Sequence, residues 1–256
     1  MGKISSADCG TLYAGGYNLL GFSTTLTWTV ELGTEEAHVL GDEWVYHDST
    51  KVKTCTVQQN GFFTDDEAGS NAAFTDIMNG EARVGGFFGM GGGGALGTIV
   101  KCFEGLMLAS FEIQAERGGL AKANGSFASA GFCKDGYLLC QDADIGTGGD
   151  EAVVHSLGAA TTSGGIGFLQ VVNYDPDGAT GLVVVIKEST HPAHAVWTTI
   201  VTFTTVTADF TSEVKEVTSV AVGTCFKVNC TWSGSPGGDQ TAEVAVAFIR
   251  TPDPAP

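Results

Sequence analysis

Apolar and polar side chains alternate along several stretches of the chain. Between residues 25 and 32, apolar residues fall at every second position, with threonine or glutamate between them, and the pattern returns over 226–232. Because successive side chains of a strand point to opposite faces, this period predicts half-buried β-strands. The continuous apolar run 182–186 predicts a strand buried on both faces. Further strands are expected at 52–58, 98–103, 106–116, 119–130, 167–172, 197–206, 214–222 and 242–250, so the chain is predicted to be mainly β.

One helix is predicted, over residues 65–79. Its first two residues are aspartates, which can cap the first turn and interact favourably with the helix dipole. Phe74, Ile77 and Met78 then recur at helical spacing and form one apolar stripe. An Asn-Gly pair ends the pattern, as is common at a helix C-terminus.

Glycine-rich and acidic stretches indicate how the chain is organised. Residues 1–21 combine glycine with tyrosine and are interpreted as an arm or a first strand, while residues 85–97 are mostly glycine and are predicted to form a loop. An acidic, glycine-rich link covers 141–151. We therefore expect two β halves: residues 1–145, with the arm, the helix and the glycine-rich loop, and residues 146–256. The sequence leaves open whether the halves are related, because no residue-level repeat is visible.

The charge balance excludes tight binding to nucleic acid. The 256 residues include 29 Asp and Glu against 12 Lys and Arg, a formal net charge of −17. Such a chain offers few cations to displace the counterions of a phosphate backbone. It could still line a passage along which nucleic acid moves, because like charge prevents sticking. A simpler interpretation is that the acidity keeps the protein in solution.

Cysteine spacing and hydropathy further limit the classes of protein to which the chain could belong. The seven cysteines are odd in number and include no C-x-x-C pair, so we expect most of them to be reduced, buried apolar residues. No signal peptide and no membrane-spanning window of about 18 apolar residues is recognisable. The start Met-Gly-Lys-Ile-Ser-Ser formally fits a myristoylation pattern, but short patterns of this kind match by chance.

Three stretches match the sequence patterns of ligand-binding motifs. The glycines at 89, 91 and 94 match a dinucleotide fingerprint, but no long helix follows to receive a pyrophosphate. His191 and His194 lie near Glu188, yet a proline between the two histidines favours a loop over a zinc site. Asp175 and Asp177 resemble the start of a calcium loop that lacks its later ligands, so a hairpin turn explains them.

No nucleophile elbow and no zinc-protease motif occurs in the sequence. Cysteines and histidines could pair in many ways, and nothing local selects one pair. We therefore expect no catalytic, cofactor-binding or metal-binding residues, no cofactor and no enzymatic activity.

Several segments, in order, resemble the major tail tube proteins of long-tailed bacteriophages. In the first half these are 13–19, 39–44 and 57–66, and in the second half 163–171, 186–190 with Trp197, and 245–250. The resemblance implies a β-sandwich or barrel of tail-tube type, with subunits that join their sheets around a channel for DNA. It also implies long loops and arms that contact the next ring.

The resemblance implies a structural virion protein, located in the tail and made in the host cytoplasm, that assembles into stacked rings. The rings would be hexameric, or trimeric and pseudo-hexameric if the two halves are related. Expected partners are further copies of the chain and neighbouring tail proteins; genomic DNA would pass through an acidic lumen without specific binding, and no membrane is involved. Alternatives are a capsid decoration or head-tail joining protein, and a carbohydrate-binding β-sandwich whose stacking platform would use Trp28, Trp44, Trp197 and Trp232.

Overall fold

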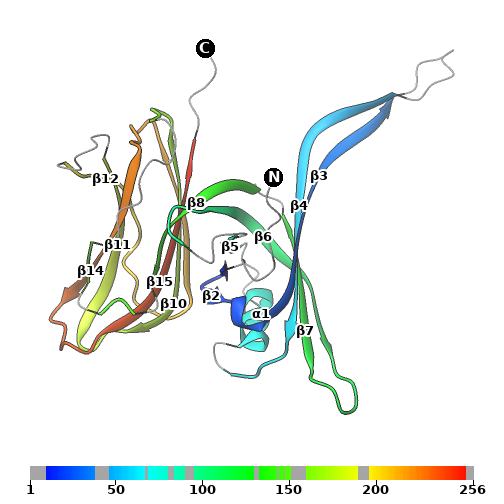
Figure 1. Ribbon diagram of the computed structural model, residues 1–256, viewed down its shortest axis with the longest axis horizontal. Coiled ribbons are helices and arrows are strands. Elements are labelled where there is room, and N and C mark those ends of the chain that lie inside the picture. Colours follow the sequence, from blue (N-terminus) through cyan, green and yellow to red (C-terminus); the bar gives the residue numbers. More distant parts are fainter. Residues whose placement is uncertain are drawn as a thin grey trace. The chain divides into compact units, whose positions relative to one another are not determined.

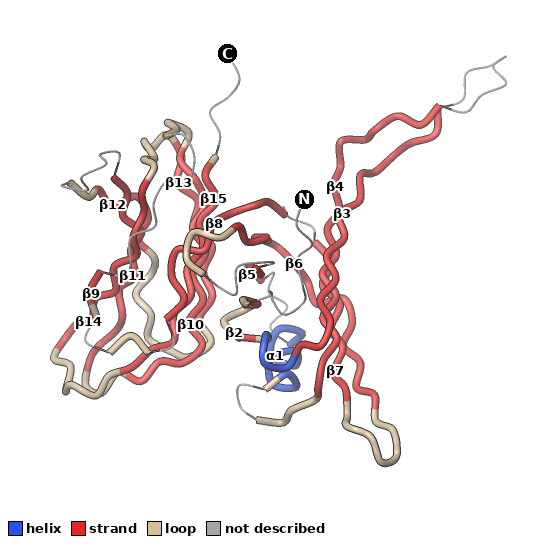
Figure 2. Tube along the Cα trace, viewed as in Figure 1, coloured by secondary structure: helices blue, strands red, loops and turns tan. Residues whose placement is uncertain are grey.

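Strands make up most of the computed structural model, which confirms a mainly β chain (Figures 1 and 2). It describes residues 10–37, 46–66, 69–79, 84–89, 95–129, 133–142, 144–146, 148–150, 160–189 and 196–251. The chain forms two compact units. The sandwich unit comprises segments 1–21, 84–102 and 134–256, and the sheet–helix unit comprises 22–83 and 103–133. Both units are built from segments that are discontinuous in sequence, whereas the sequence predicted contiguous halves that meet near residue 145.

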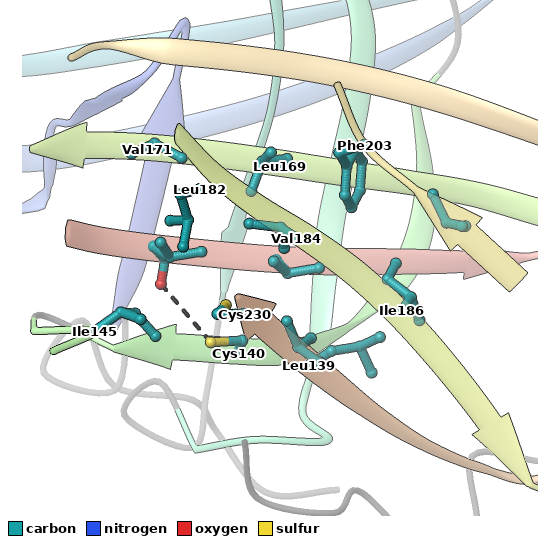
Figure 3. Packing of buried hydrophobic residues seen from close by; sticks show 14 of the residues in the cluster. Leu139, Cys140, Ile145, Leu169, Val171, Leu182, Val184, Ile186, Phe203 and Cys230 are labelled. Carbon is teal, nitrogen blue, oxygen red and sulfur yellow. Dashed lines mark hydrogen bonds between the residues drawn. The ribbon is translucent and has the colours of Figure 1, made fainter. Parts of the chain in front are cut away.

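The sandwich unit contains two antiparallel sheets that enclose an apolar core. One sheet contributes the order β13-β10-β15-β8, which is part of a longer strand order, and the other sheet has the order β12-β11-β14-β9. Leucine, valine, isoleucine and phenylalanine side chains from both sheets meet between them (Figure 3). The strands are β8 (Cys133–Asp142), β9 (Gly149–Asp150), β10 (Gly164–Asp175), β11 (Ala179–Ser189), β12 (Thr198–Thr202), β13 (Thr211–Thr218), β14 (Cys225–Gly234) and β15 (Thr241–Arg250).

β10 is buried on both faces, whereas β11 is not. In β11 the predicted run 182–186 alternates, because Val183 and Val185 are only half-buried on the outer face of their sheet. In β10, Leu169 faces the core, while Phe168 and Gln170, on the opposite face, are also fully buried. A second layer therefore covers the outer face of β10.

That layer comes from the N-terminal segment, hereafter the arm, residues 10–19. It contains β1 (Thr11–Ala14) and β2 (Tyr17–Asn18), and β1 pairs with β5 (Val84–Gly89). The prediction of a loop over 85–97 is therefore wrong for 85–89. Phe87 and Phe88 are fully buried and the glycines beside them are compatible with the ladder, so burial outweighs the weak strand preference of glycine. Residues 90–94 lie outside the described part of the chain.

The sheet–helix unit is one antiparallel sheet with a helix on one face. Within the unit the strand order is β3-β4-β7-β6, and the 3-10 turn Leu20–Phe22 precedes β3. The strands are β3 (Ser23–Ala37), β4 (Tyr46–Phe62), β7 (Lys122–Ser129) and β6 (Ile99–Gln114). β6 contributes its first residues to the sandwich unit and the rest to this one, and it joins two stretches that the sequence predicted as separate strands.

The helix α1 runs from Ser70 to Asn79, so the predicted C-terminus is correct and the predicted start at Asp65 is wrong. The caps are not the aspartates. Thr64 accepts a hydrogen bond from the Ser70 amide through Oγ1 (3.0 Å), and the Thr64 amide donates to Ser70 Oγ (3.2 Å). Asp65 accepts from the Asn71 side chain instead (2.8 Å). This reciprocal pair closes a loop before the helix, and the first turn carries no acidic residue.

Phe74 anchors α1 to the sheet. Its ring packs against Phe111 and Phe127, with centroids 5.1 and 6.1 Å apart, and it lies over Gly125, where a Cβ would come within 2.7 Å of the ring. Phe74 is fully buried, as the predicted stripe requires, whereas Met78 is 44% exposed.

We expect Phe74→Ala to lower the free energy of unfolding by about 3–5 kcal/mol, because it removes buried contacts and leaves a cavity over Gly125. The Met78→Ala control should change it by less than about 0.5 kcal/mol. Urea denaturation followed by circular dichroism measures both. Equal losses in the two variants would contradict this account of how the helix is attached.

The cysteines largely follow the prediction. Cys102, Cys140, Cys225 and Cys230 are buried and form no disulfide, and burial raises the pKa of the Cys102 thiol. Cys55 differs, because it is disulfide-bonded.

In the described residues, no helix combines the length and the hydropathy needed to cross a membrane.

Candidate assembly surfaces

β3 is an edge strand along its described length. It pairs with β4 alone, from Ser23 to Ala37, so its other side presents backbone groups that no strand of the described chain occupies. Leu26, Trp28 and Val30 follow one face of this edge, and Val30 is 46% exposed. An edge of this kind is a template for another strand.

Within the unit, β6 is the last strand in the order at the other end from β3, and it also pairs with β5 and β8. It pairs with β7 from Leu106 to Gln114, and all three pairings of the sheet are antiparallel. Because the unit holds an even number of strands, β3 and β6 run in opposite directions. A second sheet placed edge to edge, β6 against β3, would therefore continue the antiparallel alternation.

The sandwich unit, in contrast, has a protected edge at β13. Glu213 accepts hydrogen bonds from the amide (2.7 Å) and hydroxyl (3.2 Å) of Thr204. Lys215 donates to the carbonyl of Thr202 at 2.5 Å. Charged side chains on an edge strand oppose pairing with another chain. Self-association by strand pairing is therefore favoured at residues 23–30 of β3, which carry no charge, over β13; beyond them β3 carries Glu31, Glu35 and Glu36.

The two faces of the sheet–helix unit differ in chemistry. The apolar face carries α1. The opposite face, hereafter the polar face, has no described layer over it, and none of its side chains is buried. The pairing register arranges it in three rows: Thr25-Asn60-Asn124-Glu112, Thr27-Gln58-Ser126-Ser110 and Thr29-Thr56-Ala128-Met107.

Gln170 fixes the arm to the sandwich. Its Oε1 accepts from the Gly16 amide at 2.7 Å, and its Nε2 donates to Ser212 Oγ (2.9 Å) and to the carbonyl of Gly85 (3.3 Å). One buried amide thus ties the arm, β5 and β13 to β10. Tyr17 adds a ring stacked on Phe210, with centroids 4.3 Å apart.

Glu243 holds the other side of the arm. It accepts hydrogen bonds from Tyr13 Oη (3.2 Å) and from Asn18 Nδ2 (3.1 Å). Burial, followed by the charge of Glu243, raises the pKa of Tyr13 above its ordinary value. The phenol therefore stays protonated and remains a donor.

A charged cluster lies on the sheet of β11 and β14. Lys187 and Lys227 are directly opposite in register, and Asp150 separates their charges. Asp150 accepts from Lys227 Nζ at 2.5 Å and from Asn229 Nδ2 at 3.0 Å, with Lys187 Nζ at 3.6 Å. Lys227 also lies 4.4 Å from the centre of the Trp197 ring. The hydrogen bond from Lys227 is the largest cause that lowers the pKa of Asp150.

We expect this pairing to weaken in acid. A carboxyl group whose pKa is lower in the folded than in the unfolded chain stabilises the fold above its ordinary pKa of 3.8, and this contribution disappears as the pH falls through the folded value. Urea midpoints of the protein and of Asp150→Asn should therefore differ at neutral pH and converge as the pH falls below 3.8. The difference at neutral pH should be about 0.2–1 kcal/mol, since the carboxylate is 45% exposed.

Lys227→Met should remove more of that pH dependence than Lys187→Met, because its ammonium is closer to Asp150. A constant offset between the protein and Asp150→Asn across this range would contradict the assignment.

The motifs that resemble ligand sites have structural explanations where they are described. Asp175 and Asp177 form the turn between β10 and β11: the Asp177 amide donates to Asp175 Oδ1 (3.3 Å), and Asp177 Oδ2 accepts from the Asp239 amide (3.0 Å). Gly89 ends β5. Burial raises the pKa of Glu188, at the end of β11. Gly91 and Gly94 of the fingerprint, His191 and His194, and the segment 39–44 with Trp44 lie outside the described residues. The interpretations of these residues therefore remain predictions.

None of the three tryptophans in the described residues is fully exposed, as the stacking platform of a carbohydrate site would be. Trp232 lies in the sandwich core, only 8% exposed, and stacks on Tyr174. Trp197 contacts Lys227, and Trp28 is half-buried in the sheet–helix unit. In the described residues, no group of three or more His, Cys, Asp or Glu side chains is arranged to hold a metal ion.

Sequence reasoning missed the two features that distinguish these surfaces. The unpaired edge of β3 depends on the strand order, which no local pattern encodes. The Gln170 anchor is one polar residue in an apolar run, and that interruption was the available signal.

Comparisons with known proteins find remote likenesses to solved structures. A chain of the virion of a native gene transfer agent (GTA) particle is 14% identical, over 44% of this chain and 84% of that one, with a TM-score of 0.34. A chain from the tail of an empty GTA particle with C6 symmetry is also 14% identical, over 44% and 81%, with a TM-score of 0.35. The SPP1 Dit (gp 19.1) protein, described as a paradigm of the hub adsorption apparatus in phages that infect Gram-positive bacteria, is 10% identical over 94% and 99%, with a TM-score of 0.31. No family model and no curated protein matches the sequence. Likenesses of this size do not establish a function.

Proposed function

We propose that this protein is a structural subunit of a phage tail that assembles with copies of itself into rings of the tail tube, through which DNA passes. The open antiparallel sheet of the sheet–helix unit carries this proposal. Its β3 edge is unpaired in the described chain and its strand number is even, so identical sheets can join head to tail. A heterologous junction of this kind closes into a ring when the rotation per subunit divides a full turn.

The location of the protected edge supports the same function. The β13 edge of the sandwich unit carries side chains that discourage strand pairing, while the β3 edge carries a partly exposed apolar row. Strand pairing at β3 would cover Val30 and satisfy the backbone groups of the edge. The sequence resemblance to tail tube proteins and the scarcity of cations both agree with a passage that does not bind DNA.

Electron microscopy of the purified protein tests the proposal. Rings or tubes of uniform width, with an open centre, are the expected result, and their symmetry distinguishes hexamers from trimers. A protein that stays monomeric at every concentration, even with a tail nucleator, would overturn it. Binding to a preformed shell without self-assembly would instead identify a decoration or joining protein.

A further inference from the structure

Glu188 places a carboxyl group at one end of the sandwich core. It continues the row of Leu182, Val184 and Ile186 on the face of β11 that points between the sheets (Figure 3). In register it lies opposite Phe226, which is also a core residue. Glu188 is 7% exposed, and its Oε2 has no hydrogen-bond partner in the described chain. An ionised carboxylate is costly in such a place, because burial removes the water that would solvate its charge.

The segment 219–224, hereafter the latch segment, covers Glu188. Its Gly223 amide donates a hydrogen bond to the Glu188 carboxyl group, and Arg250 Nη2 donates to the Gly223 carbonyl. Val222 exchanges two backbone hydrogen bonds with Thr161, at 2.8 and 3.0 Å. Ser219 begins the segment with φ +56°, a left-handed conformation that is strained for a residue with a side chain. These hydrogen bonds therefore fix a segment that starts from a strained residue.

Two oxygen atoms face Gly223 from the same side. A Cβ on Gly223 would lie 2.0 Å from Glu188 Oε2 and 2.6 Å from the carbonyl oxygen of Ser189. While the carboxyl group is ionised, both oxygens are acceptors with partial or full negative charge, so they repel each other. A proton on Oε2 turns this atom into a donor and places an acceptor, the Ser189 carbonyl, beside it. The arrangement therefore suits the neutral form of Glu188.

We infer that Glu188 carries a proton when the latch segment is closed over it, and that ionisation of Glu188 releases this segment. The end of the sandwich core is thus a proton-sensitive latch. It tightens in acid and loosens towards neutral pH. This device lies in the sandwich unit and goes beyond the proposed function, which rests on the sheet–helix unit.

The groups around Glu188 favour its neutral form. Burial raises the pKa of Glu188, although the hydrogen bond from the Gly223 amide acts in the opposite direction. Arg250, on β15, lies over the Phe226 ring at 5.3 Å and bonds to the carbonyl of Gly223. On β12 the residue in register is Thr198, which does not titrate. The other titratable groups of this part of the described sandwich are Cys225 opposite Ser189, Tyr137 near Arg250, and Lys187, Lys227 and Asp150 on the outer face of the sheet.

Glu188→Gln tests the latch, because the amide keeps the shape of the neutral carboxyl group and does not ionise. A carboxyl group whose pKa is raised on folding stabilises the fold below its ordinary pKa of 4.5, and this contribution is lost as the pH rises through the folded value. The urea midpoint of Glu188→Gln should therefore approach that of the protein at about pH 4 and exceed it at about pH 7. Glu216→Gln, at an exposed glutamate of β13, is the matched control and should follow the unchanged protein at both.

Hydrogen exchange separates release of the latch segment from a general loss of stability. The Val222 amide donates to the Thr161 carbonyl at 2.8 Å, whereas the Leu182 amide, at the other end of the core, donates to Val206 at 2.9 Å. In the unchanged protein, the protection of Val222 relative to Leu182 should fall between about pH 4 and about pH 7, after correction for intrinsic exchange. In Glu188→Gln this ratio should stay constant. The measurement on the unchanged protein requires no variant to fold.

Three outcomes would overturn the inference. The first is a ratio of protection that does not change with pH in the unchanged protein. The second is the same pH dependence of the urea midpoint in the protein and in Glu188→Gln. The third is a rise of the midpoint with added calcium at about pH 7 that is absent in Glu188→Gln, since a cation rather than a proton would then lie between the two oxygens. All of these measurements use the dissociated protein, so they do not depend on whether rings form.

Discussion

The Val30→Lys variant is expected to fold normally and to lose self-assembly. Val30 is 46% exposed on the edge strand β3, so its replacement should change the free energy of unfolding by less than about 0.5 kcal/mol. In a junction between sheets, however, the new ammonium would lie where a neighbouring strand must pack. Natural edge strands use lysine in this way to prevent pairing. Each 1.4 kcal/mol of association free energy lost at a junction raises the dissociation constant of that junction about tenfold. A closed ring requires that every junction forms.

Val196→Lys is the matched control for this experiment. Val196 is 72% exposed in the sandwich unit, so the substitution adds the same charge at an exposed valine of the other unit. Light scattering and electron microscopy should show monomers for Val30→Lys and rings for Val196→Lys. Rings of normal stability from Val30→Lys would show that β3 is not the junction.

Gly16→Ala is expected to destabilise the sandwich unit by about 2–5 kcal/mol. Gly16 has φ +89°, and a Cβ there would lie 2.2 Å from the carbonyl carbon of Phe210. The left-handed conformation costs a non-glycine residue about 1–2 kcal/mol, and overpacking adds about 1–3 kcal/mol. Because the obstacle is backbone, no side chain can move aside to relieve it. The arm should therefore detach, which would separate Gly16 from Gln170 and Tyr17 from Phe210.

Alanine variants of two further glycines separate the cost of the left-handed conformation from the cost of overpacking. Gly118 has φ +84° with open space around it, so Gly118→Ala should show the conformational cost alone, about 1–2 kcal/mol. Gly21 has open space and no positive φ, so Gly21→Ala should be neutral within about 0.5 kcal/mol. Urea denaturation gives the three values, and near-ultraviolet circular dichroism reports the loss of the Tyr17 stack. Equal effects at Gly16 and Gly118 would show that the approach to Phe210 is not limiting.

Local patterns predicted the elements whose burial follows from their own sequence. The alternation around Leu26 and Trp28 correctly predicted a strand, and the stripe of Phe74 and Ile77 correctly predicted the buried face of the only helix in the described residues. The helix start was wrong because Thr64 reaches Ser70 across a loop, whereas sequence reasoning assigned the cap to the adjacent aspartates.

Features that depend on distant pairing could not be predicted in the same way. β5 was interpreted as a loop because glycine weakens strand propensity, and only its pairing with β1 shows that Phe87 and Phe88 are buried. The threonines at 25, 27 and 29 were visible as a polar face of one strand. Their alignment with Gln58, Asn60 and the rows of β7 and β6 required the register of three pairings, so the polar face could not be recognised from sequence.

The even number of strands in the sheet–helix unit restricts how such a subunit could change in size. Adding one strand would make the two edges run in the same direction, and every junction of a head-to-tail ring would then become parallel. Adding a hairpin would preserve the polarity and widen the ring by two strands per subunit. Variation in the bore of such rings should therefore arise by gain or loss of whole hairpins, or by a change in the number of subunits.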